Sequence, residues 1–185
     1  APIVSAYFAP DWRALAWIGR GTLQFMNLAG DLGQTVGFQD FITGIGFTPD
    51  SSRLLIVSAE YAGNQVTGVM AVFDTQTEAR LFDLKMADFI RPWAISPDGQ
   101  TVATGTFGGE IALWDLAAGQ PAATFSGPDQ LQLLAYSPAG DLLAAATEDG
   151  RFVLLAPANG APLADLPVPG TVVGVQFLLG GRVIA

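Results

Sequence analysis

Three aspartates that could serve binding stand at one recurring position of the sequence. Asp40, Asp88 and Asp129 each lie nine residues before a turn proline, and the first two are followed by phenylalanine. Carboxylates beside aromatic rings suit the docking of a basic or mixed peptide. The alternative is local, because a short loop favours an aspartate that accepts backbone N–H bonds. The candidate partner-binding rim comprises Asp40, Phe41, Asp88, Phe89, Asp129, Gln130 and Tyr61.

The sequence contains few residues suited to catalysis or to metal binding. The chain has no histidine and no cysteine, which removes the most common general base, the thiolate nucleophile and the usual zinc ligands. No serine lies in a Gly-x-Ser-x-Gly sequence, and "GTFGG" and "GNQVTG" lack the lysine and following helix of a phosphate-binding loop. We therefore predict no enzyme activity, no cofactor and no metal site in this segment.

The charge balance limits the class of partner. The chain has 8 basic and 17 acidic residues, a net charge of −9, and its basic residues are scattered. Phosphate backbones and anionic membrane surfaces need clustered Lys and Arg, so we predict no nucleic acid partner, and a basic or neutral protein fits better. No apolar run approaches the ~20 residues of a membrane span, so no membrane insertion is expected. Cysteine-free chains occur in both cytoplasmic and exported proteins, and no compartment is assigned.

Short strands joined by tight turns must position these residues. The chain is 50% hydrophobic and 14% charged, with 22 glycines and 12 prolines. Runs such as "LLAAAT" and "TVATGTF" do not alternate between apolar and polar residues, which is typical of strands buried on both faces. Residues 77–90 fit either an amphipathic helix or an edge strand, and comparison with "QPAATFSG" and "APLADLP" favours the strand. The fold class is therefore all-β.

Similar units recur with a period near 40 residues. Turn prolines stand at positions 10, 49, 97 and 138, and Leu179 takes this place in the last copy, so the spacings are 39, 48, 41 and 41. Such a period indicates a repeat architecture. The long spacing coincides with "EYAGNQVTG", which we interpret as a hairpin-loop insertion of about seven residues that carries Tyr61. The expected units of one partial domain, 1–185, are 1–39, 40–87, 88–128, 129–168 and the incomplete 169–185.

These units resemble the blades of WD-repeat β-propellers of a bacterial type. The third copy carries a Ser-Pro-Asp-Gly turn at 96–99 and a strand that ends in Trp114-Asp115; the fourth matches well, and the first two match more weakly. The second copy also resembles propeller repeats found beside peptidase domains and in periplasmic binding proteins. The resemblance covers essentially the whole chain. It implies four-stranded antiparallel blades, and it places the rim aspartates on the face where such proteins usually bind partners.

The departures from the family pattern concern its polar network. The family often has Gly-His before the first strand, whereas this chain has Gly127-Pro128, and Trp114 faces a hairpin with Gly108-Gly109 where an aspartate would stand. No copy has every member of the network. We therefore expect apolar packing to hold the blades together, and we expect Trp17 and Trp114, which lie in apolar strand runs, to be packing residues.

The extent of the chain predicts an incomplete ring. About four and a half blades are present, the start "APIVSAYF" lacks a methionine, and the end falls after the second strand of a unit. We expect an open arc that is a fragment of a longer propeller. The alternative, a closed five-bladed ring, needs two strands that the N-terminus does not offer.

Two classes of function follow from the resemblance. The first is a non-catalytic scaffold or sensing module that binds proteins or peptides. The alternative is a propeller attached to a peptidase-type hydrolase whose catalytic domain lies outside this segment. A Gly-x-Ser-x-Gly sequence after Ala185 would favour the hydrolase, whereas further blades would favour the scaffold.

Overall fold

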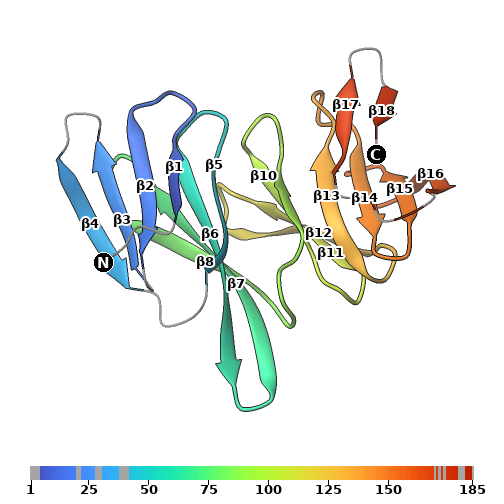
Figure 1. Ribbon diagram of the computed structural model, residues 1–185, viewed down its shortest axis with the longest axis horizontal. Helices are drawn as coiled ribbons and strands as arrows, with labels where there is room; N and C mark the ends of the chain where they lie inside the picture. Colours follow the sequence, from blue (N-terminus) through green and yellow to red (C-terminus); the bar gives the residue numbers. More distant parts are fainter. Residues whose placement is uncertain are drawn as a thin grey trace. The chain divides into compact units, whose positions relative to one another are not determined.

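Apolar runs between glycine and proline turns form strands throughout the part of the chain that the structure describes. The computed structural model describes residues 5–19, 22–27, 31–37, 42–168, 170, 172, 174–178 and 182–184. Over these residues the chain forms eighteen strands and no α-helix, which confirms the all-β class (Figure 1). Consequently, no helix capable of crossing a membrane is found among them. The chain divides into unit 1, Ala1–Phe89, and unit 2, Ile90–Ala185.

Unit 1 contains two four-stranded antiparallel sheets with strands in sequence order. Sheet 1 consists of β1 (Ser5–Phe8), β2 (Ala14–Gly19), β3 (Thr22–Asn27) and β4 (Leu32–Gly37). Sheet 2 consists of β5 (Ile42–Phe47), β6 (Arg53–Ala62), β7 (Gln65–Asp74) and β8 (Arg80–Met86). The position of β8 confirms a strand, and not a helix, within residues 77–90.

Unit 2 contains two further sheets of the same kind and a two-stranded sheet. Sheet 3 consists of β9 (Trp93–Ile95), β10 (Thr101–Gly105), β11 (Glu110–Asp115) and β12 (Gln120–Ser126). Sheet 4 consists of β13 (Leu131–Tyr136), β14 (Leu143–Thr147), β15 (Arg151–Leu155) and β16 (Pro162–Pro167). The two-stranded sheet pairs β17 (Gln176–Leu178) with β18 (Arg182–Ile184).

Strand β14 shows why the apolar runs do not alternate. All five of its residues are buried. Ala145 packs in a cluster with Ala103 and Ile111 of sheet 3, whereas Ala144 and Ala146 belong to a second cluster that includes Val172. Because successive side chains point to opposite faces, a strand between two sheets buries both sets, and small alanines let the sheets approach closely.

Sheets 1 and 2 pack face to face in the same way. Their shared core includes Leu23 and Phe25 of β3 with Ile56 of β6 and Phe73 of β7. The Phe25 and Phe73 rings lie 5.8 Å apart between centroids and are tilted by 57°. Apolar contact between neighbouring sheets therefore holds unit 1 together, as expected from the incomplete polar network.

The predicted Ser-Pro-Asp-Gly turn closes a hydrogen-bonded ring between β9 and β10. The Ser96 hydroxyl donates to the Asp98 carboxylate at 2.6 Å and accepts from the Thr101 N–H at 2.9 Å. The Gly99 N–H donates to the Ser96 carbonyl at 2.9 Å, and Gly99 has a φ of 71°, which glycine adopts without steric cost. Ser137 makes the equivalent bonds to Asp141 and to the Leu142 N–H in sheet 4.

Trp114 retains one bond of the family's network. Its indole Nε1–H donates to the Thr104 hydroxyl at 2.7 Å, and the side chain is only 8% exposed. At the Gly108-Gly109 pair, where the family has an aspartate, a backbone hydrogen bond is present: the Gly127 N–H donates to the Gly109 carbonyl at 2.7 Å. The predicted packing role of Trp114 is confirmed, and its buried donor is satisfied.

The insertion in the second copy is not a loop, which corrects the interpretation from sequence. It lengthens β6 and β7 to ten residues each, and the ladder continues to the pair Ala62 and Gln65. Only Gly63 and Asn64 form the turn, and Gly63 has a φ of 62°. A two-residue hairpin turn favours glycine at its first position, which lets the strands pair up to the turn.

Candidate functional site

In each sheet the connections between successive strands lie alternately at the two ends of the strands, and we name these two ends by the connections they carry. The turn edge is the end of the strands that carries the β1–β2, β3–β4, β5–β6 and β7–β8 connections and their counterparts in unit 2. We call the opposite edge, with the β2–β3 and β6–β7 hairpins, their counterparts and the links to the next sheet, the hairpin edge. Antiparallel pairing places the two edges at opposite ends of every sheet. Among the predicted rim residues, Tyr61, Asp88, Phe89, Asp129 and Gln130 are described, and they lie at the hairpin edge of their own unit.

In unit 1, two predicted rim residues meet. The Tyr61 ring, on the β6–β7 hairpin, lies edge-on to the Phe89 ring with centroids 6.0 Å apart. Their exposed fractions are 59% and 39%. Asp88 precedes Phe89, and its carboxylate accepts the Phe89 N–H at 2.7 Å, which is the local loop role considered from the sequence. Asp40 and Phe41 lie outside the described residues.

The hairpin that carries Tyr61 is amphipathic. Tyr61 is paired with Val66, so both side chains lie on the ribbon face that faces Phe89. Glu60 lies on the other face and forms an ion pair with Lys85, whose Nζ is 3.1 Å from the Glu60 Oε2. The ribbon extends beyond the last described pairs with β5 and β8, as Figure 1 shows for β6 and β7. Tyr61 is therefore presented by a paired ribbon with regular register.

In unit 2, the predicted residues lie beside an exposed aromatic ring. The Gln130 N–H donates to the Phe107 carbonyl at 2.7 Å, and the Gln130 carbonyl accepts from the Glu148 N–H at 3.0 Å. These bonds tie the loop that contains Asp129 to the hairpins of sheets 3 and 4. Phe107 is 56% exposed. Each unit thus places an exposed aromatic ring and a carboxylate on its hairpin edge.

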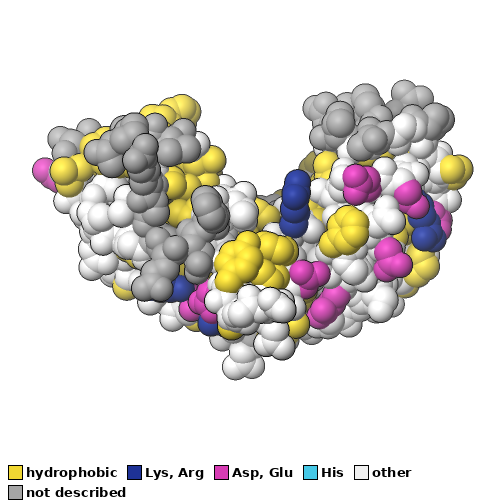
Figure 2. Space-filling model, turned by 60° about the horizontal axis from the view of Figure 1, so that its bottom comes forward, with side chains coloured by type: hydrophobic (Ala, Val, Ile, Leu, Met, Phe, Trp, Pro, Cys, Tyr) yellow, Lys and Arg dark blue, Asp and Glu magenta, His cyan; other side chains and the backbone are white. Residues whose placement is uncertain are grey.

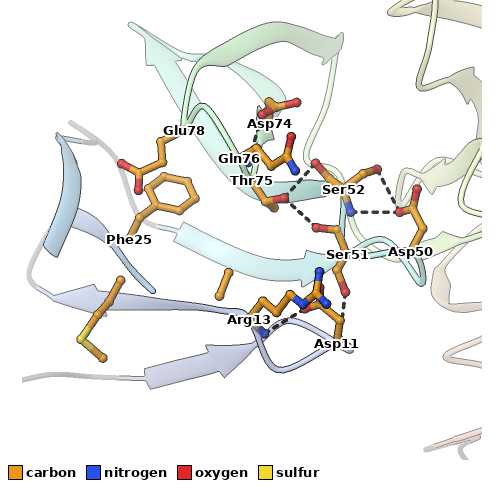
Figure 3. Close-up of a pocket in the computed structure, with 12 residues that line it drawn as sticks. Asp11, Arg13, Phe25, Asp50, Ser51, Ser52, Asp74, Thr75, Gln76 and Glu78 are labelled. Carbon is orange, nitrogen blue, oxygen red and sulfur yellow. Dashed lines mark hydrogen bonds and ion pairs between the residues drawn. The ribbon is translucent and has the colours of Figure 1, made fainter. Parts of the chain in front are cut away.

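The turn edge of unit 1 holds a pocket that the sequence interpretation missed. It has a volume of about 540 Å³ and lies between the turns of sheets 1 and 2 (Figure 3). The Asp11 N–H donates to the Ser51 hydroxyl at 3.0 Å and so joins the two turns. The pocket is lined by Asp11, Arg13, Ala14, Phe25, Met26, Asp50, Ser51, Ser52, Asp74, Thr75, Gln76 and Glu78.

Hydrogen bonds keep two carboxylates of this pocket ionised. The Thr48 hydroxyl donates to Asp50 at 2.6 Å and lowers the pKa of that carboxyl below its ordinary value. The Thr77 N–H, at 2.7 Å, does the same for the pKa of Asp74. In sheet 3 the Ser96 hydroxyl likewise lowers the pKa of Asp98. A carboxylate that accepts such bonds is stabilised in its charged form.

Unit 2 has a smaller pocket at its turn edge. Its volume is about 340 Å³, and Asp98, Leu113 and Tyr136 are among its lining residues. Burial raises the pKa of the Tyr136 phenol, whose oxygen lies 3.4 Å from the Thr101 hydroxyl. The two pockets are lined by equivalent turns of the two units, as expected from the repeat.

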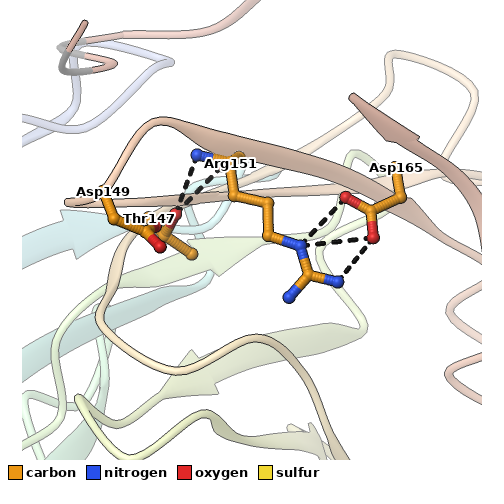
Figure 4. Close-up of polar contacts among 4 residues, drawn as sticks. All are labelled: Thr147, Asp149, Arg151 and Asp165. Atoms are coloured by element: carbon orange, nitrogen blue, oxygen red, sulfur yellow. Dashed lines mark hydrogen bonds and ion pairs between the residues drawn. The ribbon is translucent and has the colours of Figure 1, made fainter. Parts of the chain in front are cut away.

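The arginine of β15 has a structural partner. Arg151 donates from Nε and Nη2 to the Asp165 carboxylate, at 3.0 and 2.5 Å, across the pair β15–β16 (Figure 4). The bond to Arg151 lowers the pKa of Asp165, and the same bond raises the pKa of Arg151. Both side chains are about half exposed, so this ion pair fixes the outer strand locally and contributes little to global stability.

The described residues offer binding chemistry more readily than catalysis. Ser96 and Ser137 are engaged in turns, and no group of three or more acidic, His or Cys residues among the described positions could hold a metal ion. Hydrophobic and acidic side chains both reach the surface on the face drawn in Figure 2. These are the components of a protein-docking surface.

Comparison with known families identifies one repeat directly. Residues 90–115 match the family described as WD40: WD domain, G-beta repeat. The matched segment runs from the loop before β9 to the end of β11, and it includes the Ser96 turn and Trp114. Residues 90–115 are therefore similar to a WD40 repeat, and the four four-stranded antiparallel sheets of the described residues are consistent with WD40 blades. No curated protein sequence matches the chain. WD40 domains are typically non-catalytic scaffolds that bind proteins.

Proposed function

We propose that this chain is a non-catalytic, propeller-type scaffold that binds a partner protein or peptide at its hairpin edge. The observation that carries the proposal is the pairing of Tyr61 with Phe89. Two exposed aromatic rings in contact supply a large, nearly rigid apolar surface, and such side chains are frequent anchors of interfaces.

Charge supports a basic or mixed partner. Asp88 adjoins Phe89 in unit 1, and Asp129 adjoins Gln130 in unit 2. Together with the net charge of −9, these carboxylates favour encounter with cationic segments and disfavour nucleic acid. The residues of the candidate rim are retained in this proposal, and the Tyr61–Phe89 pair of unit 1 is its principal anchor.

Peptides selected from a random library against the full chain test the proposal. Isothermal titration of a selected peptide is expected to show binding about 10–100-fold weaker for Tyr61→Ala and for Phe89→Ala, the range of interface anchors. Leu163→Ala is the matched control, because Leu163 is 57% exposed on β16 and lies outside the rim. Peptides that bind both aromatic variants as tightly as the wild type would contradict the proposal.

The acidic residues are tested separately. The triple variant Asp40→Asn, Asp88→Asn, Asp129→Asn is expected to slow association and to flatten its dependence on salt, because long-range attraction acts on the encounter rate. A single exposed carboxylate generally contributes only about 0–1 kcal/mol to such an interaction. An unchanged association rate at low salt would leave these aspartates with their loop role alone.

A further inference from the structure

The turn edge of unit 1 carries a second exposed aromatic pair. Phe8 and Trp12 are 50% and 63% exposed, and their ring centroids lie 5.1 Å apart with the rings tilted by 37°. Phe8 is the last residue of β1, and Trp12 lies in the following turn. This pair is therefore at the opposite end of the sheets from the hairpin edge.

The backbone of Trp12 gives no local reason for a tryptophan. Its φ is 61°, and the equivalent residues of sheets 3 and 4 are Gly99 and Gly140, with φ of 71° and 76°. A bulky residue in the left-handed region is sterically unfavourable, so the fold alone favours glycine here. The exposed ring suits recognition at the surface, where aromatic anchors are most effective.

The residues on either side of Trp12 connect it to the pocket of Figure 3. Asp11 and Arg13 line this pocket together with Asp50, Asp74 and Glu78, so its lining carries four carboxylates and one guanidinium (Figure 3). The Arg13 side chain is 87% exposed and its Nε is 4.0 Å from Asp11. The Glu78 carboxylate accepts the Gln34 N–H.

Part of this negative charge is available to a ligand. Within the described part of the chain, every hydrogen bond to Asp50 and to Asp74 ends on Oδ1. The Oδ2 atom of each carboxylate can therefore accept from a cationic donor. A guanidinium is the cation that best fits an exposed aromatic pair beside carboxylates. It stacks on aromatic rings and donates two parallel hydrogen bonds to a carboxylate, whereas an ammonium is a strongly hydrated point charge.

We propose that the turn edge of unit 1 is a second binding site, which takes an arginine-bearing segment of a partner protein. The arginine stacks on the Trp12–Phe8 pair and donates to the carboxylates of the adjoining pocket. The site is independent of the Tyr61–Phe89 pair, so a failure of either proposal leaves the other in place.

The test uses the full ¹⁵N-labelled chain and the acetylated, amidated peptide Ala-Arg-Ala-Arg-Ala. The indole N–H signal of Trp12, assigned from its loss in Trp12→Gly, is expected to shift and saturate on titration. The same peptide with citrulline in place of arginine keeps the shape and loses the charge, and it is expected to bind at least about tenfold more weakly. Adding about 0.5 M NaCl is expected to weaken the arginine peptide severalfold.

Variants locate the site. Trp12→Gly is expected to weaken binding about tenfold while the fold is kept, because glycine occupies this turn position in sheets 3 and 4. Asp50→Asn is expected to weaken it as well, whereas Asp98→Asn, at the same turn position of sheet 3, and Leu163→Ala, outside both proposed sites, are expected to leave it unchanged.

Three outcomes would overturn the proposal. They are the absence of a saturable shift, equal binding of the citrulline peptide, and wild-type affinity in Trp12→Gly. Sedimentation equilibrium that shows a dimer dissociated by Trp12→Gly would assign the aromatic pair to a second copy of the chain, and it would also overturn the proposal.

Discussion

Sheets 1 and 3 build the same turn from different chemistry. In sheet 3 the Ser96 hydroxyl bonds to Asp98 and to the Thr101 N–H, so the turn satisfies itself. In sheet 1 Ala9 stands in place of the serine, and the Asp11 N–H bonds instead to the Ser51 hydroxyl of sheet 2. The turn of sheet 1 therefore lacks the hydroxyl's bonds and makes one bond to the neighbouring sheet.

The backbone is nevertheless alike in the two turns. Ala9 N–H donates to the Ala14 carbonyl at 2.9 Å, and Ser96 N–H donates to the Thr101 carbonyl at 2.9 Å. The strand register imposes this geometry, and the side chains add to it. A repeat can therefore lose the serine of the turn and keep the backbone geometry of the turn. The side chains at the turn are then available for binding.

Removing Trp114 is expected to have the largest effect on stability. Trp114→Ala in sheet 3 should lower the free energy of unfolding by about 3–5 kcal/mol, because it replaces a large buried side chain with a cavity. Trp17→Ala in sheet 1 should cost less, since Trp17 is only half-buried. Denaturant unfolding of both variants measures the contrast, and equal losses would show that the two sheets depend on their tryptophans alike.

Exchanging the turn residues tests the hydroxyl directly. Ser96→Ala should destabilise by about 1–2 kcal/mol, because the Thr101 N–H and Asp98 lose a buried partner. Ala9→Ser supplies the missing acceptor at a position that is 2% exposed, and it should stabilise by about 0–1 kcal/mol. Thermal unfolding monitored by circular dichroism compares them. A gain from Ser96→Ala would show that the hydroxyl is not structural.

Replacing Trp12 should separate binding from stability. Trp12→Gly relieves an unfavourable backbone conformation, and after the loss of the Phe8 contact a net gain of about 0.5–1 kcal/mol is expected. The midpoint of denaturant unfolding should rise or stay the same. A clear fall in the midpoint would mean that the aromatic pair stabilises sheet 1 and is retained for that reason.

Acid should weaken the turns of sheets 2 and 3 by a smaller amount. Because hydrogen bonds lower the pKa of Asp50, Asp74 and Asp98, their contribution to stability is present above the ordinary aspartate pKa and is lost as the pH falls through the folded value. The free energy of unfolding should fall between about pH 5 and pH 2. Asp98→Asn should flatten this dependence, and Asp129→Asn serves as the charge-matched control. If the free energy of unfolding depended on pH equally in both variants, the acid effect could not be assigned to the hydrogen-bonded carboxylate of the turn.

Local spacing predicted much of the fold correctly. The recurring prolines located the β1–β2, β5–β6, β9–β10 and β13–β14 turns, and the Ser-Pro-Asp-Gly sequence predicted a turn whose hydrogen bonds span only five positions. Trp114 was assigned to packing because it lies in an apolar run. These features depend on contacts between near neighbours in the chain, which residue order encodes directly.

The candidate sites could be predicted only in part. The sequence nominated Tyr61 and Phe89 separately, but their contact joins residues 28 positions apart and depends on the ten-residue ladder of β6 and β7. The sequence interpretation took the same segment for a loop, because polar and small residues at a hairpin tip have no strand periodicity. Trp12 carried one signal that was missed, a bulky residue where two other copies have glycine.

By itself, the sequence determined that this protein is an all-β repeat chain, rich in acid and without the residues for common catalysis. Spacing, turn residues and composition are properties of the chain itself. Tertiary structure alone decided that the Tyr61 and Phe89 rings meet and that a pocket opens between the turns of sheets 1 and 2. Register and sheet-on-sheet packing bring together side chains that are distant in sequence, and no local pattern records those distances.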